Sequence, residues 1–190
     1  MKDFLVDPLL GLKSYENLLE NIKSKVKPIS VHGLMEENFA QFCYALKQHT
    51  NKQILVITYE DIKARSIYDD INSFDEGDSI YLFPKKEILF YDVDAFSSER
   101  THQRIKVLSK LKEDDKATVI TSIDALMDKI VSRKLFDDNS LKILLGEDLD
   151  LNKTINTLIT SGYERVPMVE SIGQFSLRGG ILDIFPADNK

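Results

Sequence analysis

Residues 53–74 read QILVITYEDIKARSIYDDINSF and join a short apolar run to a longer segment with helical periodicity. The run at residues 53–58 has the length and composition of a buried strand. Apolar side chains then recur at helical spacing, at Ile62, Ile67, Ile71 and Phe74. This pattern predicts a helix over residues 61–74 with Asp61 as its N-cap. A strand followed directly by an amphipathic helix is the repeating unit of a parallel α/β sheet.

The same unit recurs on both sides of this stretch. After a helical lead-in over the first 25 residues, apolar runs predict further strands at residues 29–34, 79–83 and 117–121. Helices are expected between and after them, at residues 37–48, 97–112 and 123–131, the last capped by Ser122. Four short apolar strands that alternate with helices predict a three-layer α/β domain.

Beyond residue 134 the order of elements changes. A strand is expected at 141–145, a helix at 151–161, and three strand-like pieces at 163–170, 174–178 and 181–185. This order predicts a small α+β domain, antiparallel at its end. A polar cluster at residues 136–139 predicts a turn, which divides the chain into domains of residues 1–138 and 139–190. The partners of the last strand are not all accounted for, so we expect the second domain to be truncated and the chain to be a piece of a longer protein.

Composition excludes several classes of protein. The chain has 190 residues, a formal net charge of −6, 43% apolar residues and a single cysteine, Cys43. One cysteine forms neither an internal disulfide nor a zinc cluster, and its apolar neighbours predict burial. Neither a signal peptide nor an apolar run of ~18 residues occurs, so a soluble, cytoplasmic protein is expected. The acidic balance disfavours a whole-surface nucleic-acid binder, although local basic patches are compatible with it.

The turn after residues 29–34 occupies the place of a phosphate-binding loop but lacks the chemistry of one. The template G-x-x-x-x-G-K-[ST], counted from Gly33, puts Asn38, Phe39 and Ala40 at the second glycine, the lysine and the hydroxyl. Glutamates 36 and 37 lie where phosphate charge would sit. We therefore expect no nucleotide hydrolysis by this chain, no cofactor and no catalytic residue.

Other candidate chemistry is sparse. His32, His49 and His102 have no metal-ligand spacing around them, so no metal site is expected. The helix at 97–112 is rich in basic residues, with Arg100, Arg104, Lys106, Lys110 and Lys112 against the single acid Glu99. With an apolar side at Ile105, Leu108 and Leu111, this helix has two readings: a solvated charged face, or a patch that contacts phosphates.

The most informative segment is GQFSLRGGILDIFP, residues 173–186. Two strands that meet at Arg178-Gly179-Gly180 predict a tight hairpin, because glycine supplies the positive φ of such turns. Asp183 lies within an otherwise apolar strand, where a charge needs a partner or the surface. Arg178 is either a structural arginine or, on a rigid hairpin, an anchor for contact with another protein.

The run QFSLRGGILDIFP resembles a hairpin of bacterial transcription-repair coupling factors and, more loosely, of UvrB, the damage-recognition subunit of the bacterial excision nuclease. Other stretches have the order and spacing of the coupling factors' amino-terminal region, and the resemblance covers residues 30–190. These stretches are FYDVDAFSSE (90–99), RTHQRIKVLSKL (100–111), TVITSIDALMDKI (118–130) and SGYERVPMVE (161–170).

The resemblance implies a RecA-like α/β domain that has lost its nucleotide-binding residues, with a small inserted domain and a return segment. The small domain is the family's docking surface for UvrA, and by motif match Arg178 belongs to that surface. Residues 85–96 are too short to hold the DNA-clamping hairpin of UvrB.

The resemblance also implies partners and activities that lie in other parts of the protein. A carboxy-terminal domain would mask the docking surface until RNA polymerase stalls. Binding of polymerase and DNA, and an ATP-driven translocase with its ATP and Mg²⁺, would belong to further domains, so the chain itself is not expected to be an enzyme. The alternative is a DNA-binding or nucleotide-binding RecA-like domain of a UvrB-type helicase.

Overall fold

The computed structural model describes residues 3–75, 77, 79–86 and 94–186. Its strands form two separate sheets of three strands each. The main sheet contains β1 (Ile54–Thr58), β2 (Ile80–Phe83) and β3 (Thr118–Ser122), and the small sheet contains β4 (Glu164–Arg165), β5 (Gln174–Arg178) and β6 (Ile181–Ile184). The helices are α1 (Asp3–Leu10), α2 (Lys13–Lys23), the 3₁₀ turn η1 (Glu36–Asn38), α3 (Phe39–Thr50), α4 (Asp61–Phe74), α5 (Asp94–Glu113), α6 (Ile123–Met127), α7 (Arg133–Asp138) and α8 (Leu151–Thr160).

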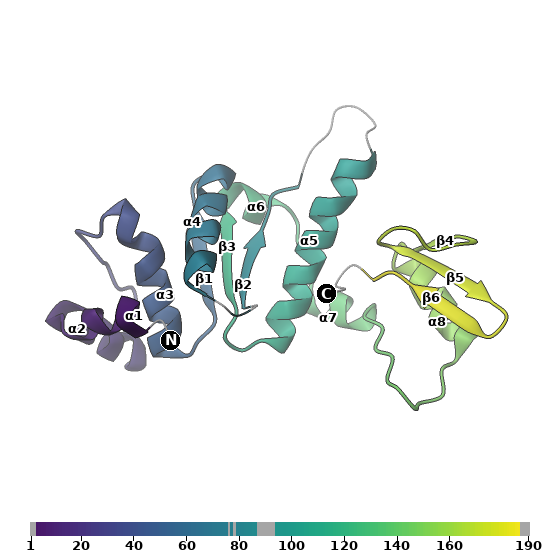
Figure 1. Ribbon diagram of the computed structural model, residues 1–190, viewed down its shortest axis with the longest axis horizontal. Coiled ribbons are helices and arrows are strands. Elements are labelled where there is room, and N and C mark those ends of the chain that lie inside the picture. Colours follow the sequence, from purple (N-terminus) through teal and green to yellow (C-terminus); the bar gives the residue numbers. More distant parts are fainter. Residues whose placement is uncertain (1–2, 76, 78, 87–93, 187–190) are drawn as a thin grey trace.

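The main sheet is entirely parallel, with the strand order β1-β3-β2. The central strand β3 is buried along its whole length, as expected when helices cover both faces. Figure 1 shows α4 on one side of this sheet and α5 on the other. The predicted α/β class, with a parallel sheet between helices and a smaller sheet after it, is confirmed.

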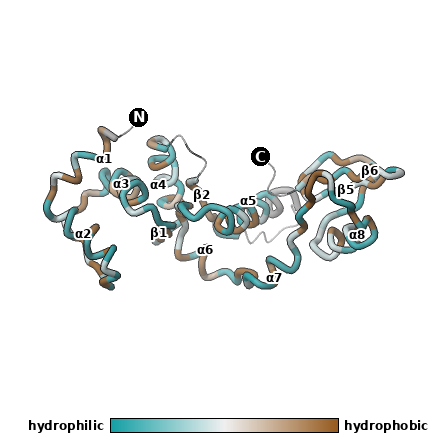
Figure 2. Tube along the Cα trace, turned by 90° about the horizontal axis from the view of Figure 1, so that it is seen from below, coloured by the Kyte–Doolittle hydropathy of each residue, from teal (hydrophilic) through white to brown (hydrophobic). Residues whose placement is uncertain are grey.

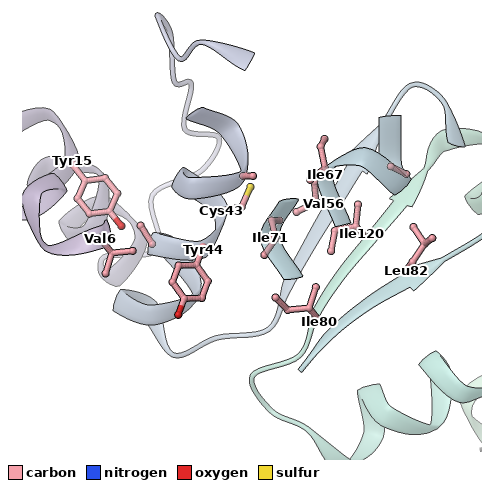
Figure 3. Close-up of a cluster of buried hydrophobic side chains, with 13 residues drawn as sticks. Val6, Tyr15, Cys43, Tyr44, Val56, Ile67, Ile71, Ile80, Leu82 and Ile120 are labelled. Atoms are coloured by element: carbon pink, nitrogen blue, oxygen red, sulfur yellow. The ribbon is translucent and has the colours of Figure 1, made fainter. Parts of the chain in front are cut away.

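The core lies mainly between the main sheet and α4. Val56, Ile120 and Leu82 direct their side chains to this face, and α4 meets them with Ile67 and Ile71 (Figure 3). α3 packs against the outer side of α4 and adds further buried residues, Ala40, Cys43, Tyr44 and Ala45. On the opposite face, a smaller cluster joins Phe83 and Val119 to Val107 of α5.

The amino-terminal residues form two helices instead of one continuous lead-in. α1 and α2 pack on α3, and Tyr15 is buried there with its hydroxyl 2.9 Å from Nδ1 of His49. Cys43 is buried as predicted, and burial raises the pKa of its thiol to about 12.

The small sheet combines two kinds of pairing. β5 pairs with β6 in antiparallel fashion, as predicted, whereas β4 runs parallel to β5. The strand predicted at 163–170 is reduced to the two residues of β4. The N–H groups of Glu164 and Val166 donate to the carbonyls of Gly173 and Phe175, and no strand pairing is described beyond them. Figures 1 and 2 both place this sheet at the end of the molecule opposite to α1 and α2.

The strand predicted at residues 29–34 is wrong. In the structure this segment pairs with no strand among the described residues, and Val31 is 49% exposed. Gly33 has φ +80°, which interrupts an extended backbone. The main sheet therefore has three described strands where the sequence predicts four.

The strand predicted at residues 141–145 is also wrong. The segment is irregular, and Ile143, Leu144 and Leu145 are exposed. Its apolar composition suggested a buried strand, but no described strand lies beside it to provide a hydrogen-bonding partner.

The helix predicted at 123–131 ends earlier than expected. α6 stops at Met127, because Asp128 leaves the helix to accept a hydrogen bond from the Lys86 N–H (3.1 Å) and to pair with Arg104. A separate helix, α7, then covers the segment predicted as a polar turn at 136–139 up to Asp138. Ser122 caps α6 as predicted and accepts from the Ala125 N–H at 3.3 Å.

Among the described residues, no helix is long and apolar enough to span a membrane. The same residues contain no group of three or more histidine, cysteine or acidic side chains placed to hold a metal ion.

Candidate functional site

The β5–β6 hairpin ends in a turn that points away from α5 (Figure 1). Gly179 in that turn has φ +59°, a left-handed backbone that favours glycine. In the antiparallel register, Arg178 faces Ile181 and Ser176 faces Asp183. These four residues share one face of the sheet, since successive side chains alternate between faces.

Arg178 and Asp183 form an ion pair on this face. The Arg178 Nη2 atom donates to Oδ2 of Asp183 at 2.6 Å, and the side chains remain 59% and 40% exposed. A charged residue in an apolar strand needs either a partner or access to solvent, and Asp183 has both. Because an exposed pair stabilises a fold by at most about 1 kcal/mol, the main consequence is that Arg178 is held in a defined orientation.

Ile181 adds an apolar side chain next to this pair and is 64% exposed. Its exposure follows from the two-residue alternation of β6, which places Ile181 and Asp183 on the same face. The sequence reading missed Ile181, although the alternation would have indicated it. An oriented arginine beside an exposed apolar residue suits contact with another protein.

The hairpin is anchored from both faces of the small sheet. Phe175 is fully buried and Leu158 of α8 is 3% exposed. The Gln174 side chain accepts hydrogen bonds from the N–H groups of Glu170 and Ser171, and Ser176 donates to the Pro167 carbonyl. These contacts fix the backbone from which Arg178 projects.

Two of the residues at the phosphate-loop position, Phe39 and Ala40, are turned toward the core, whereas Gly33 and Asn38 are exposed. Ala40 is buried and Phe39 packs against the same core, while Asn38 ends η1 and Gly33 precedes it in the irregular segment. Glu36 forms an ion pair with Lys63 of α4. The structure therefore places Gly33, Asn38, Phe39 and Ala40 away from Arg178.

Asp61 has a different role from the predicted N-cap. Glu60 occupies the N-cap position without a side-chain cap. The Asp61 carboxylate instead accepts from the Ser122 hydroxyl (3.2 Å) and the Lys85 N–H (3.3 Å), and pairs with Arg100 (3.4 Å). It thereby joins the carboxyl ends of the sheet strands to the start of α5.

Arg104 contradicts both readings of the basic helix, because it is 5% exposed. Its guanidinium donates to the carbonyls of Pro84 (2.7 Å) and Ala125 (3.2 Å), pairs with Asp128 (3.6 Å) and lies 4.1 Å from the centre of the Phe83 ring. Desolvation lowers its pKa, and the charge of Asp128 opposes that effect. Arg104 therefore serves the fold.

The other basic residues of α5 are mostly paired with carboxylates. Lys110 pairs with Glu113 (3.0 Å) and Lys112 with Asp137 (2.7 Å). The helix face thus offers few uncommitted charges for phosphates, which weakens the reading of this helix as a nucleic-acid contact.

Comparison with known proteins gives concordant matches. The family model for the UvrB interaction domain matches residues 141–190. The transcription-repair-coupling factor of Bacillus subtilis strain 168 is 28% identical over 172 residues, which cover 90% of this chain and 15% of that protein. Transcription-repair-coupling factors of Staphylococcus aureus strains RF122 and USA300 are each 31% identical over 161 residues, which cover 85% of this chain and 13% of those proteins.

The chain thus spans a small part, at most 15%, of the length of these relatives. The segment matched to the UvrB interaction domain contains α8, all three strands of the small sheet and the Arg178–Asp183 pair.

Proposed function

Because the chain belongs to the transcription-repair-coupling factor family, we propose that it is an interaction module whose small domain binds UvrA. In this function it recruits nucleotide excision repair to stalled RNA polymerase. The observation that carries the proposal is the oriented, exposed Arg178 on the hairpin of the segment matched to the UvrB interaction domain. The chain itself contributes recognition, and catalysis belongs to other parts of the protein.

The hairpin is suited to this role because little must be ordered on binding. Arg178 is already held by Asp183, and the backbone beneath it is fixed by Phe175 and by the hydrogen bonds of Gln174. Pre-organisation of this kind lowers the entropy lost on association. An acidic group of UvrA would replace or share the Asp183 contact, and Ile181 would bury its apolar side chain beside it.

Arg178→Ala is expected to weaken binding of the chain to UvrA by about 2 kcal/mol, or roughly thirtyfold in Kd. The loss follows from removal of a charged anchor near the centre of the contact. Biolayer interferometry with immobilised UvrA measures the change directly. Arg133→Ala is a matched control, since Arg133 is an exposed arginine of α7 outside the small sheet.

If neither Arg178→Ala nor Arg133→Ala changes the Kd for UvrA, Arg178 does not take part in the UvrA contact. Arg178→Lys separates charge from geometry: it keeps the charge but loses the planar fork, so we expect an intermediate affinity.

For the main sheet and its helices, we propose a RecA-like scaffold that no longer binds nucleotide. Support comes from Phe39 and Ala40, which face the core where a phosphate-binding loop would present a lysine and a hydroxyl. Glu37 adds an exposed negative charge there. We propose the boundary between this scaffold, residues 1–138, and the docking domain, residues 139–190, at the end of α7.

Isothermal titration of the chain with Mg-ATP is expected to give no heat of binding. The physical reason is the lack of a lysine and of a glycine-rich cradle at Gly33–Ala40, together with the glutamates that repel phosphate. Saturable binding that Phe39→Ala leaves intact would contradict the scaffold proposal and favour a nucleotide-binding domain of a UvrB-type helicase.

The remaining parts of the proposal concern the whole protein, which acts in the cytoplasm. Its other domains contact RNA polymerase and DNA and use ATP and Mg²⁺ for translocation. A carboxy-terminal domain masks the hairpin until the polymerase is engaged.

A further inference from the structure

The part of the chain with the main sheet and the part with the small sheet are joined by residues 139–150, the long connection between α7 and α8 in Figure 1. Every residue of this connection is exposed, and it contains neither a helix nor a strand. No described residue at 141–186 forms a hydrogen bond or an ion pair with residues 3–138. Two parts joined in this way move relative to one another unless other contacts hold them.

One contact across this division joins His102 of α5 to Gly173, the residue before β5. A methyl group built on Gly173 would lie 3.6 Å from Nε2 of His102, so the imidazole faces this glycine. His102 is half-buried, and burial lowers the pKa of its imidazole. The ring is therefore neutral near pH 7 and meets the small sheet without a net charge.

Gly173 is a rigid point of the small sheet. Its N–H donates to the carbonyl of Phe185 at 2.8 Å, and its carbonyl accepts from the N–H of Glu164 at 2.9 Å. Its φ of +83° is a left-handed backbone that favours glycine. Because these bonds tie Gly173 to β4 and to the residue after β6, a side chain that contacts Gly173 contacts the frame of the whole small sheet.

We propose that the His102–Gly173 contact fixes the direction of the β5–β6 hairpin relative to the main sheet. While the contact is made, α5 and the small sheet move as one body. When it is lost, the small sheet swings as a unit on the flexible connection at residues 139–150.

The contact acts on the hairpin through β5. This strand begins next to Gly173 and ends at Arg178, so the contact and the hairpin turn lie at opposite ends of it. A swing of the small sheet therefore changes the direction in which Arg178 points but leaves its ion pair with Asp183 intact. The proposal concerns the arrangement of two parts of this chain and does not depend on UvrA binding.

The test measures the distance between two spin labels by pulsed electron paramagnetic resonance. One label is attached to α4 through Arg65→Cys and the other to α8 through Asn156→Cys, both at exposed positions, and Cys43→Ala removes the native thiol. We expect a narrow distribution of distances with His102 in place, and a distribution about twofold wider or more after His102→Ala. His32→Ala removes an exposed histidine outside the contact and is expected to leave the distribution unchanged.

A further variant and a second measurement separate orientation from folding. His102→Phe keeps a flat, uncharged ring and is expected to keep the narrow distribution. The amides of β5 and β6 are expected to keep their protection from hydrogen exchange after His102→Ala, because the hairpin itself stays folded.

Three results would overturn the proposal. An equally narrow distribution after His102→Ala would mean that residues 139–150 hold the small sheet without the ring. A wide distribution with His102 in place would mean that the contact holds nothing. Loss of protection in β5 and β6 after His102→Ala would assign His102 to the folding of the small sheet and not to its direction.

Discussion

Arg104→Met is expected to lower the free energy of unfolding by about 2–4 kcal/mol. The substitution keeps much of the side-chain volume but removes the donors to the buried carbonyls of Pro84 and Ala125. It also leaves the carboxylate of Asp128 without its ion pair and removes the cation from the face of Phe83. The carbonyl of Pro84 follows β2, the carbonyl of Ala125 belongs to α6, and Asp128 follows α6. Loss of the Arg104 guanidinium therefore removes the contacts that join α5 to all three segments. Urea unfolding followed by circular dichroism measures the change.

Arg133→Met is the matched control, since its side chain is 86% exposed and pairs weakly with Asp137 at 3.9 Å. We expect a change below about 0.5 kcal/mol. If Arg104→Met proves equally mild, the carbonyls of Pro84 and Ala125 must find water as a substitute, and Arg104 does not hold the carboxyl ends of the strands together.

The main sheet was predictable where a short apolar run is followed by a segment with helical periodicity. Residues 53–58 have the length and apolar composition of a buried strand, and apolar side chains recur at helical spacing over residues 61–74. The structure has β1 and α4 there. Residues 29–34 and 141–145 have the same apolar composition, but a strand also needs a partner. Local composition does not reveal whether one is available.

The polar contacts at the ends of the strands were less predictable. A charged residue on an amphipathic helix is usually solvated, and Arg104 departs from that rule because carbonyls and Asp128 from distant parts of the sequence converge on it. Aspartate is a common N-cap residue, but the Asp61 carboxylate instead contacts Ser122, Lys85 and Arg100. Such contacts depend on the relative placement of several elements, which local periodicity does not specify.

The hairpin illustrates the opposite case. The turn at Gly179, the antiparallel pairing and the need of Asp183 for a partner follow from local rules of strand geometry. The partner proves to be Arg178, five residues away. Binding of UvrA by Arg178 depends on the partner's surface as well, so the local rules of strand geometry do not predict it.

Phe175→Ala is expected to unfold the small domain while the main sheet remains folded. Phe175 is fully buried between its neighbours on β4 and β6, and truncation of a buried phenylalanine to alanine costs about 3–5 kcal/mol. A domain of about 50 residues has a total stability of roughly 3–8 kcal/mol, so the loss is comparable to the whole. Hydrogen exchange measured by mass spectrometry is expected to show rapid exchange in α8, β5 and β6, with protection retained in β1, β3 and α4.

The control for this experiment is Ile181→Ala, which truncates a 64% exposed apolar residue of the same sheet. We expect it to leave exchange unchanged but to weaken UvrA binding modestly, since Ile181 lies beside Arg178. Phe175→Ala should abolish UvrA binding through loss of the folded hairpin, so exchange and binding together separate a structural role from a contact role. Rapid exchange that spreads into β1 and β3 would instead mean that the two sheets unfold as one unit, and the proposed boundary after residue 138 would be wrong.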